Sequence, residues 1–338
     1  MLQSLKNIFK KESLPCAVVI ITLAFGTGIL SYKLFDSSPR GTQKDCLSDL
    51  FFVNPEPDCE LYEKKLESMS TLQDNLEDLT KKYLAEKKAN RIGVFSRDLK
   101  TRRFVGVNDT NVFVMASLLK VPLAIAYFRL SEITPDIFSQ QIKHTNANIL
   151  ENSSSQRIKP KEDLVLGNMY TVRELIYRML AYSDNASAQM LSTNFVSPDY
   201  LNKVLLALGL QVTKAGETEN ILTAKTYAGI FRTLYNASFL SRDSSNNVLD
   251  ILSQSTFADG ATALLPKNVK VAHKFGERII VDEKETIIIQ QLHDCGIVYA
   301  KNGDEPYTFC ILTEGKKYED LKYVIQNLSK AIFDEMSK

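Results

Sequence analysis

Histidine and paired cysteines are scarce in this chain of 338 residues. It has three histidines, His144, His273 and His293, no two of them close in sequence, and its five cysteines form no Cys-x-x-Cys pair. Zinc sites usually take their ligands from such closely spaced pairs. We therefore expect no metal site and no cofactor.

The chain also lacks an excess of charge of either sign. Lys and Arg total 41 against 40 Asp and Glu, a formal net charge of +1. A protein that binds nucleic acid through its phosphates needs a basic surface, so this balance argues against such a partner. The sequence has no internal repeat and no low-complexity tract, and a hydrophobic fraction of 44% is enough for a packed core.

One uncharged run stands near the start of the chain. Residues 13–32 contain no charged side chain, and three lysines precede them. A helix of roughly 20 apolar residues spans a bilayer, and positive charge stays on the cytoplasmic side. We therefore expect a cytoplasmic N-terminus over 1–12, a transmembrane anchor over 13–32 and an extracytoplasmic domain in the cell envelope. Cleavage as a signal peptide, followed by secretion, is the alternative, because Ala24-Phe-Gly26 has the small-x-small pattern of a cleavage site.

An oxidising compartment would allow the cysteines to pair. Cys46 and Cys59 could close a small loop at the end of a polar linker over 33–58, stabilising it by roughly 3 kcal/mol. Cys295 and Cys310 lie on two expected neighbouring strands and could also pair. Both pairs could instead be small buried apolar side chains, so the sequence leaves both disulfides open.

The order of element types predicts an α+β fold for residues 59–338. The expected elements are a charged helix over 60–88, a hairpin over 92–107, helices over about 114–255, strands over 269–313 and a helix over 318–336. The first helix is either a stalk coiled coil or a helix packed on the domain. We expect one antiparallel sheet built from both ends of the domain, flanked by helices, with an all-helical subdomain inserted.

A serine and a lysine stand one helical turn apart at the start of an apolar helix. Ser117 and Lys120, within Met115-Ala-Ser-Leu-Leu-Lys-Val-Pro122, share one face of that turn. A serine hydroxyl is a poor nucleophile unless a neighbour accepts its proton. A lysine can do so only if burial or a second cation lowers its pKa from about 10.4. The helix N-terminus also directs N–H groups toward an oxyanion formed on the serine.

Two further segments carry polar groups. Ser183-Asp184-Asn185 lies at a break among the helices, where it could simply be a helix N-cap. Lys274-Phe-Gly276 ends a strand pattern, where the glycine admits a ligand close to the backbone and the lysine could simply be solvated. In this order the three segments resemble the Ser-x-x-Lys, Ser-Asp-Asn and Lys-Thr-Gly motifs of class A serine β-lactamases and penicillin-binding proteins. The resemblance covers roughly residues 90–335, and the β-lactamase/transpeptidase-like fold of that family agrees with the expected order of elements.

The resemblance implies an acyl-enzyme mechanism. Ser117 would be the acylated nucleophile, Lys120 its general base, and Ser183 the relay of a proton to the leaving nitrogen. The substrate would be an amide, either a β-lactam or a D-alanyl peptide derived from peptidoglycan. Four further residues would bind it: Asn185, Lys274, Gly276 and Glu277. The backbone N–H groups of Ser117 and Glu277 would form the oxyanion hole, where loss of one donor typically costs about 3 to 4 kcal/mol of transition-state stabilisation.

Two departures from the family pattern bear on activity. Phe275 stands where the family normally has Thr or Ser, whose hydroxyl helps to bind a substrate carboxylate. Glu219, within Glu219-Asn-Ile-Leu-Thr223, matches the class A glutamate that activates the deacylating water, with Glu217 as the other candidate, but the segment is short. We therefore expect slow deacylation. A catalytically impaired binding or structural module on the same fold is the alternative function. A Ser-His-Asp hydrolase is disfavoured, because the chain has no Gly-x-Ser-x-Gly elbow.

Overall fold

A computed structural model describes most of the chain from residue 69 onward. The described residues are Phe52, 69–145, 157–211, 220–284 and 286–337. Within these ranges no helix is both long enough and apolar enough to cross a membrane. The expected anchor over 13–32, the Cys46–Cys59 pair, Glu217 and Glu219 lie outside the described residues, so those predictions stay predictions.

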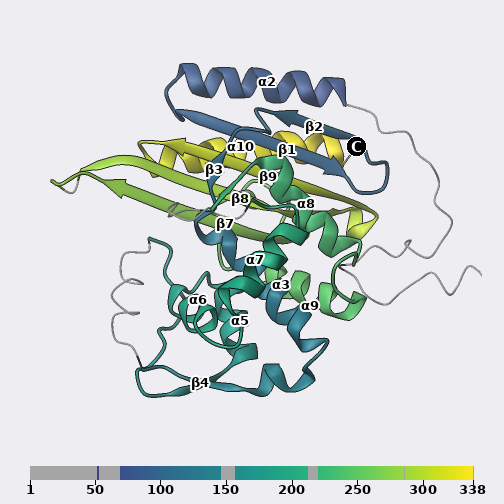
Figure 1. The fold of residues 1–338 in the computed structure, drawn as a ribbon. Helices are drawn as coiled ribbons and strands as arrows, with labels where there is room; N and C mark the ends of the chain where they lie inside the picture. Colours follow the sequence, from purple (N-terminus) through teal and green to yellow (C-terminus); the bar gives the residue numbers. More distant parts are fainter. Residues whose placement is uncertain (1–51, 53–68, 146–156, 212–219, 285, 338) are drawn as a thin grey trace, which may run out of the picture. The chain divides into compact units, whose positions relative to one another are not determined.

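A five-stranded antiparallel sheet forms the centre of the domain (Figure 1). Its strands lie in the order β2-β1-β9-β8-β7. Their bounds are β1 Arg91–Asp98, β2 Phe104–Val107, β7 Lys270–Val281, β8 Ile287–Ala300 and β9 Glu305–Gly315, with the short turn η3 Lys301–Gly303 between the last two. Since β1 from the start of the domain pairs with β9 from its end, both ends build one sheet, as predicted.

Two helices cover one face of the sheet. α2 (Ser70–Ala85) and α10 (Tyr318–Met336) share a core with that face, to which α2 contributes Leu72, Leu76 and Tyr83 (Figure 1). The spacing of these side chains places them on one side of the helix. Of the two interpretations of this helix, packing on the domain is therefore correct for residues 70–85.

A helical block, residues 116–253, packs on the other face of the sheet. Its elements are η1 Ala116–Leu119, α3 Lys120–Ser131, η2 Pro135–Ser139, α5 Val172–Ala181, α6 Asn185–Ser192, α7 Pro198–Ala207, α8 Ala224–Tyr235 and α9 Arg242–Ser253. α3 is buried almost all round because it lies at the centre of the block.

The expectation of an all-helical insertion is wrong in one respect. Two short strand pairs stand in this part of the chain: β3 (Phe113–Val114) with β6 (Ile221–Leu222), and β4 (Gln141–Lys143) with β5 (Met169–Thr171). In β4 only the middle residue, Ile142, is buried, the alternation typical of a strand. Segments this short cannot form a stable helix, so they satisfy their backbone groups by pairing with each other.

One of the two cysteine pairs is a cross-strand pair within the sheet. Cys295 of β8 lies directly opposite Cys310 of β9, and a disulfide joins their sulfur atoms. Both side chains are fully buried. The pairing thus links two central strands beneath the helical block.

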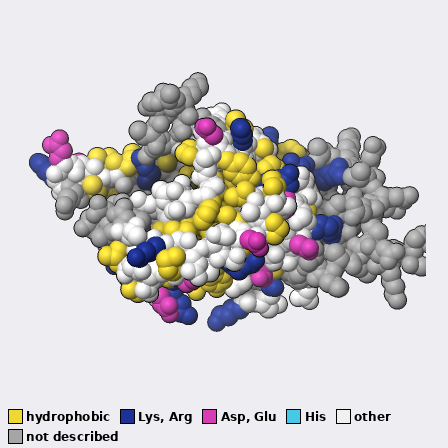
Figure 2. Space-filling view, turned by 60° about the horizontal axis from the view of Figure 1, so that its bottom comes forward, with side chains coloured by type: hydrophobic (Ala, Val, Ile, Leu, Met, Phe, Trp, Pro, Cys, Tyr) yellow, Lys and Arg dark blue, Asp and Glu magenta, His cyan; other side chains and the backbone are white. Residues whose placement is uncertain are grey.

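Several large apolar side chains of the helical block are exposed to solvent. Ile133 is 72% exposed and Leu206 62%. Figure 2, in which the lower part of Figure 1 comes forward, shows hydrophobic side chains gathered across the middle of this face and charged ones mostly toward its margins. Apolar atoms contribute much of the surface of any protein, so this face by itself identifies no partner.

Candidate active site

Ser117 lies on a tight turn between β3 and α3. Ala116 has a φ of 47°, a left-handed conformation that is costly for a residue with a Cβ, and a 3₁₀ turn follows before the α-helix begins at Lys120. The buried hydroxyl of Tyr227 donates to Leu118 O at 2.7 Å and holds the turn from beneath. Backbone strain of this kind persists where surrounding contacts fix it. The turn therefore fixes the backbone of the partly exposed Ser117.

Lys120 is buried beside the Ser183 segment. Its Nζ donates to Ser183 O at 2.6 Å, to Asn185 Oδ1 at 2.6 Å and to Ser183 Oγ at 3.1 Å. Burial lowers the pKa of Lys120 from 10.5 to about 7, although the carboxylates of Asp184 and Glu277 oppose the shift. A substantial fraction of this amine is therefore neutral near pH 7, as a general base must be.

Ser183 lies between two lysines. Its Oγ accepts from Lys274 Nζ at 2.7 Å as well as from Lys120, and its φ of 57° is again left-handed. Asp184 caps α6 by accepting from the backbone N–H of Ala186 at 2.9 Å, and it pairs with buried Arg178 at 3.0 Å. The Ser-Asp-Asn segment is thus a helix cap, as the simpler interpretation has it, and the cap also holds Ser183 against both lysines.

Lys274 is fully buried rather than solvated. Besides Ser183 Oγ, its Nζ donates to Phe275 O at 2.9 Å. Burial, and then the neighbouring charge of Lys120, hold the pKa of Lys274 well below its usual range. The charge of Lys120 thus lowers the pKa of Lys274, whereas the lowered pKa of Lys120 itself comes from burial.

Gly276 brings β7 close to the turn that carries Ser117. A Cβ at this position would lie 3.3 Å from Met115 O and 3.4 Å from Leu118 N. A side chain here would require its neighbours to shift by a few tenths of an ångström. β7 is also one of the two edge strands of the sheet, so one row of its backbone groups has no strand partner. The two segments expected to supply the oxyanion hole, at Ser117 and Glu277, are therefore in contact.

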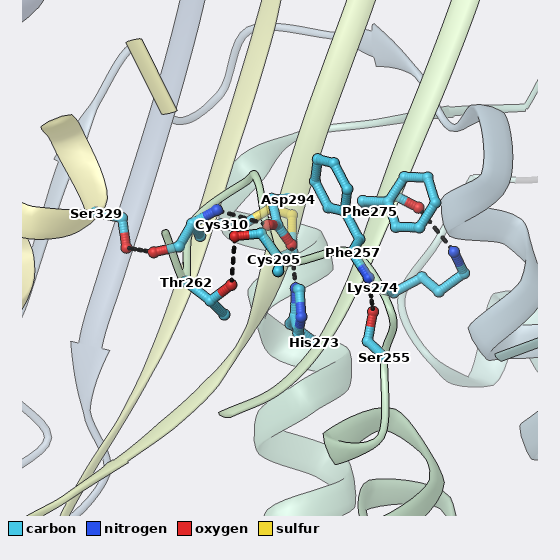
Figure 3. A network of polar contacts seen from close by, with 12 residues as sticks. Ser255, Phe257, Thr262, His273, Lys274, Phe275, Asp294, Cys295, Cys310 and Ser329 are labelled. Atoms are coloured by element: carbon cyan, nitrogen blue, oxygen red, sulfur yellow. Dashed lines mark hydrogen bonds and ion pairs between the residues drawn. A yellow bond between two sulfur atoms is a disulfide. The ribbon is translucent and has the colours of Figure 1, made fainter. Parts of the chain in front are cut away.

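Phe275 occupies the core behind the site. Its fully buried ring packs against Phe257 at a centroid distance of 4.4 Å, in the core shared with α10 (Figure 3). Successive side chains of a strand point to opposite faces, which explains why Phe275 and Gly276 differ. The phenyl ring stands in place of a hydroxyl and lies 4.1 Å from Lys274 Nζ, so it contacts this lysine from the core.

The Glu277 carboxylate has a contact that the motif comparison did not predict. Its Oε1 accepts from the backbone N–H groups of Arg157 at 3.1 Å and Ile158 at 3.2 Å. These two hydrogen bonds hold residues 157–158 of the helical block against β7, next to the two lysines. The sequence indicated that Glu277 belongs to the site, because it follows Lys-x-Gly. It gave no sign that residues 157–158 contact Glu277.

Comparison with known proteins identifies the family. The family model of the beta-lactamase enzyme family matches residues 72–336. The chain belongs to this family.

None of its described residues forms a group of three or more His, Cys, Asp or Glu side chains that could hold a metal ion.

Individual relatives of this β-lactamase family protein are distant. The β-lactamase VEB-1 of Pseudomonas aeruginosa is 26% identical over 275 residues, which cover 76% of this chain and 89% of the relative. A β-lactamase of Bacillus licheniformis is 24% identical over 246 residues, 69% of this chain and 74% of the relative. Among solved structures, the TLA-3 extended-spectrum β-lactamase aligns with a TM-score of 0.68 at 20% identity, covering 79% of this chain and all of that one (100%). PBP-A aligns with a TM-score of 0.65 at 19% identity, covering 80% and 98%. These two structural matches establish the fold.

Proposed function

We propose that this protein is a serine hydrolase that forms an acyl-enzyme on Ser117 with a β-lactam or a D-alanyl peptide amide. One observation carries the proposal: Lys120, with a pKa of about 7, shares the Ser183 hydroxyl with a second buried lysine. A buried pair of lysines with lowered pKa values is costly to maintain in a merely structural domain. The same pair supplies a base and a relay to a serine nucleophile.

The groups of the site allow a balanced acylation step. Neutral Lys120 accepts the proton of the Ser117 hydroxyl while Ser117 Oγ forms a bond to the carbonyl carbon of the amide. The carbonyl oxygen takes up the negative charge beside the N–H groups of Ser117 and Glu277. When the C–N bond breaks, Ser183 Oγ passes a proton from the lysine pair to the leaving nitrogen. The hydrogen bonds of Ser183 to Lys120 and Lys274 support that route.

Penicillins are the probe of choice for this reaction. A PBP-A variant has been solved as an acyl-enzyme complex with penicillin G; it aligns with this chain at a TM-score of 0.66 and 19% identity, covering 81% of this chain and 98% of that one. The full-length protein in detergent would be incubated with labelled penicillin G, digested, and its adduct located by peptide mass spectrometry. A single adduct on Ser117 supports an acyl-enzyme. Absence of any adduct, with an intact fold, favours the catalytically impaired module.

We expect a burst of acylation followed by slow turnover. Deacylation needs a second base to position a water, and loss of such a base typically slows a step by about 10²–10⁴-fold. Of the described residues of the site, both lysines already serve acylation, the Asp184 carboxylate pairs with Arg178, and the Glu277 carboxylate accepts from two backbone N–H groups. A pre-steady-state trace with a chromogenic β-lactam would show a stoichiometric burst and a second phase at least ~100-fold slower. Linear turnover that Glu219→Gln abolishes would instead make Glu219 a working deacylation base.

The negative charge of Glu277, beside the two lysines, should lower the rate of acylation by anionic substrates. Glu277→Gln keeps an oxygen acceptor for the N–H groups of Arg157 and Ile158 but removes a negative charge. That charge raises the pKa of Lys120 and repels a substrate carboxylate. Its removal should therefore increase both the neutral fraction of Lys120 and the binding of an anionic substrate. We expect the second-order rate constant for penicillin G at pH 7 to rise by about three- to tenfold. The matched variant Glu277→Ala also loses the acceptor and should gain less; an unchanged or lower rate in Glu277→Gln would contradict the prediction.

We also propose that the uncharged run over 13–32 tethers the domain outside the cytoplasm. Three lysines before the run support this orientation. Protease added to intact spheroplasts should digest the domain, whereas a cytoplasmic marker stays whole. Full protection of the domain would reverse the topology, and its recovery from the medium would favour a cleaved signal peptide.

A further inference from the structure

A cavity lies beside the first residues of β7, apart from the Ser117 site. Its volume is about 340 Å³, and its walls come from the end of α9, the connection that follows and the first residues of β7. No residue assigned to the Ser117 site lines it. Pockets that hold small molecules start at roughly 300 Å³. The space therefore suits a small ligand.

His273 is the buried polar group of this cavity. It is 3% exposed, and its Nδ1 lies 2.8 Å from Asp294 Oδ1 (Figure 3). The other oxygen, Asp294 Oδ2, accepts from the backbone N–H of Ala261 at 2.8 Å. Because this carboxylate accepts at both oxygens, His273 Nδ1 is the donor, and the ring is fixed in one orientation. Among the described residues His273 Nε2 has no hydrogen-bond partner.

The charges around the cavity are of one sign. Its charged lining residues are Lys267 and Lys270; the described lining contains no carboxylate, although the carboxylate of Asp294 lies behind His273. Lys270 Nζ lies 4.7 Å from the ring centroid of Phe52 at one margin. Three hydroxyl side chains also line the space: Ser253, Ser255 and Thr262. The two lysines attract an anion and can donate hydrogen bonds to it.

The remaining walls are apolar. Phe257, Leu265 and Val271 belong to the core behind β7 and line the cavity as well. A ligand here would thus meet donors and positive charge on one side and hydrocarbon on the other. An inorganic anion would leave the apolar wall unused, whereas a carboxylate with an apolar body would use both.

We propose that this cavity is a second binding site, for a small organic carboxylate. Its carboxylate lies beside the ring of His273 and pairs with Lys267 and Lys270 at the rim, and its apolar body rests on Phe257 and Leu265. The site is independent of acylation on Ser117, because none of its groups takes part in that step.

Benzoate serves as the probe, with benzyl alcohol as its neutral counterpart. The full-length protein carrying labelled histidine would be titrated with each, and the three imidazoles assigned by His→Gln variants. We expect saturable shifts of the His273 signals by benzoate, with a Kd of about 1 mM, and at least tenfold weaker binding of benzyl alcohol. Shifts confined to His144 or His293, no saturable shift, or equal binding of both probes would overturn the proposal.

A matched pair of lysine variants tests the charge argument without disturbing the core. Lys267→Gln, at the rim, should weaken benzoate binding by about threefold or more. Lys225→Gln, an exposed lysine at the start of α8, should leave it unchanged. Equal effects of the two variants would show that benzoate is attracted by the general positive charge of the protein and would contradict the proposed site. Since neither measurement uses acylation, failure here leaves the function proposed for Ser117 unaffected.

Discussion

Ser117→Ala is expected to abolish covalent labelling by penicillin while the fold stays intact. The variant removes the only atom that bonds to the carbonyl carbon in the proposed step, and loss of a catalytic serine in other hydrolases lowers the rate by about 10⁴–10⁶-fold. Stability should change little, because Ser117 is partly exposed and its Oγ has no hydrogen-bond partner among the described residues. Substitutions of this kind usually change the free energy of unfolding by less than about 0.5 kcal/mol.

The control is a second exposed serine outside the site. Ser192 ends α6 and its Oγ donates only to Gln189 O, so Ser192→Ala should label at the normal rate. Intact-protein mass spectrometry gives the labelled fraction of each variant, and thermal unfolding gives its Tm. Labelling that persists in Ser117→Ala would place the nucleophile elsewhere and refute the assignment.

The sheet and the three motifs were predictable from the sequence because each depends on local pattern. The hairpin and late strands carry dense β-branched and aromatic runs, and β1 indeed pairs with β9. Ser117 and Lys120 are a helical turn apart, so their proximity follows from spacing. The meeting of Ser183 and Lys274 at 2.7 Å depends on packing across the domain; only the motif order indicated it.

What the sequence could not predict is which way certain side chains point and what they contact. Phe275 stands where the family has a carboxylate-binding hydroxyl, yet its ring packs in the core against Phe257 and contacts Lys274 from there. The Lys274 ammonium could have been solvated, and burial could not be read from one lysine beside a glycine. Contacts between distant segments, such as Glu277 with Ile158 and His273 with Asp294, leave no periodic signal.

Lys120→Arg should be nearly as damaging to acylation as Lys120→Ala, at about 10²–10⁴-fold. Arginine remains protonated at any working pH and cannot accept the serine proton. It would also place a permanent charge beside Lys274. The two lysines now share the Ser183 hydroxyl, whose Oγ lies 2.7 Å from Lys274 Nζ. Because an arginine is larger and Lys120 is buried, Lys120→Met serves as a companion of similar length without charge. Both variants should lose acylation, and a Tm measurement checks that each is folded.

The pH profile of acylation separates a base from an electrostatic partner. Burial brings the pKa of Lys120 to about 7, so below that pH the amine is protonated and the wild-type rate should fall about tenfold per pH unit. Above it the rate should level off, whereas a lysine of ordinary pKa would require pH values above about 10. In Lys120→Arg the residual rate should lose this inflection, because no group at position 120 titrates in the range. A Lys120→Arg protein that keeps most of the rate, with the inflection still near pH 7, would show that the base is another group and that Lys120 acts only through its charge.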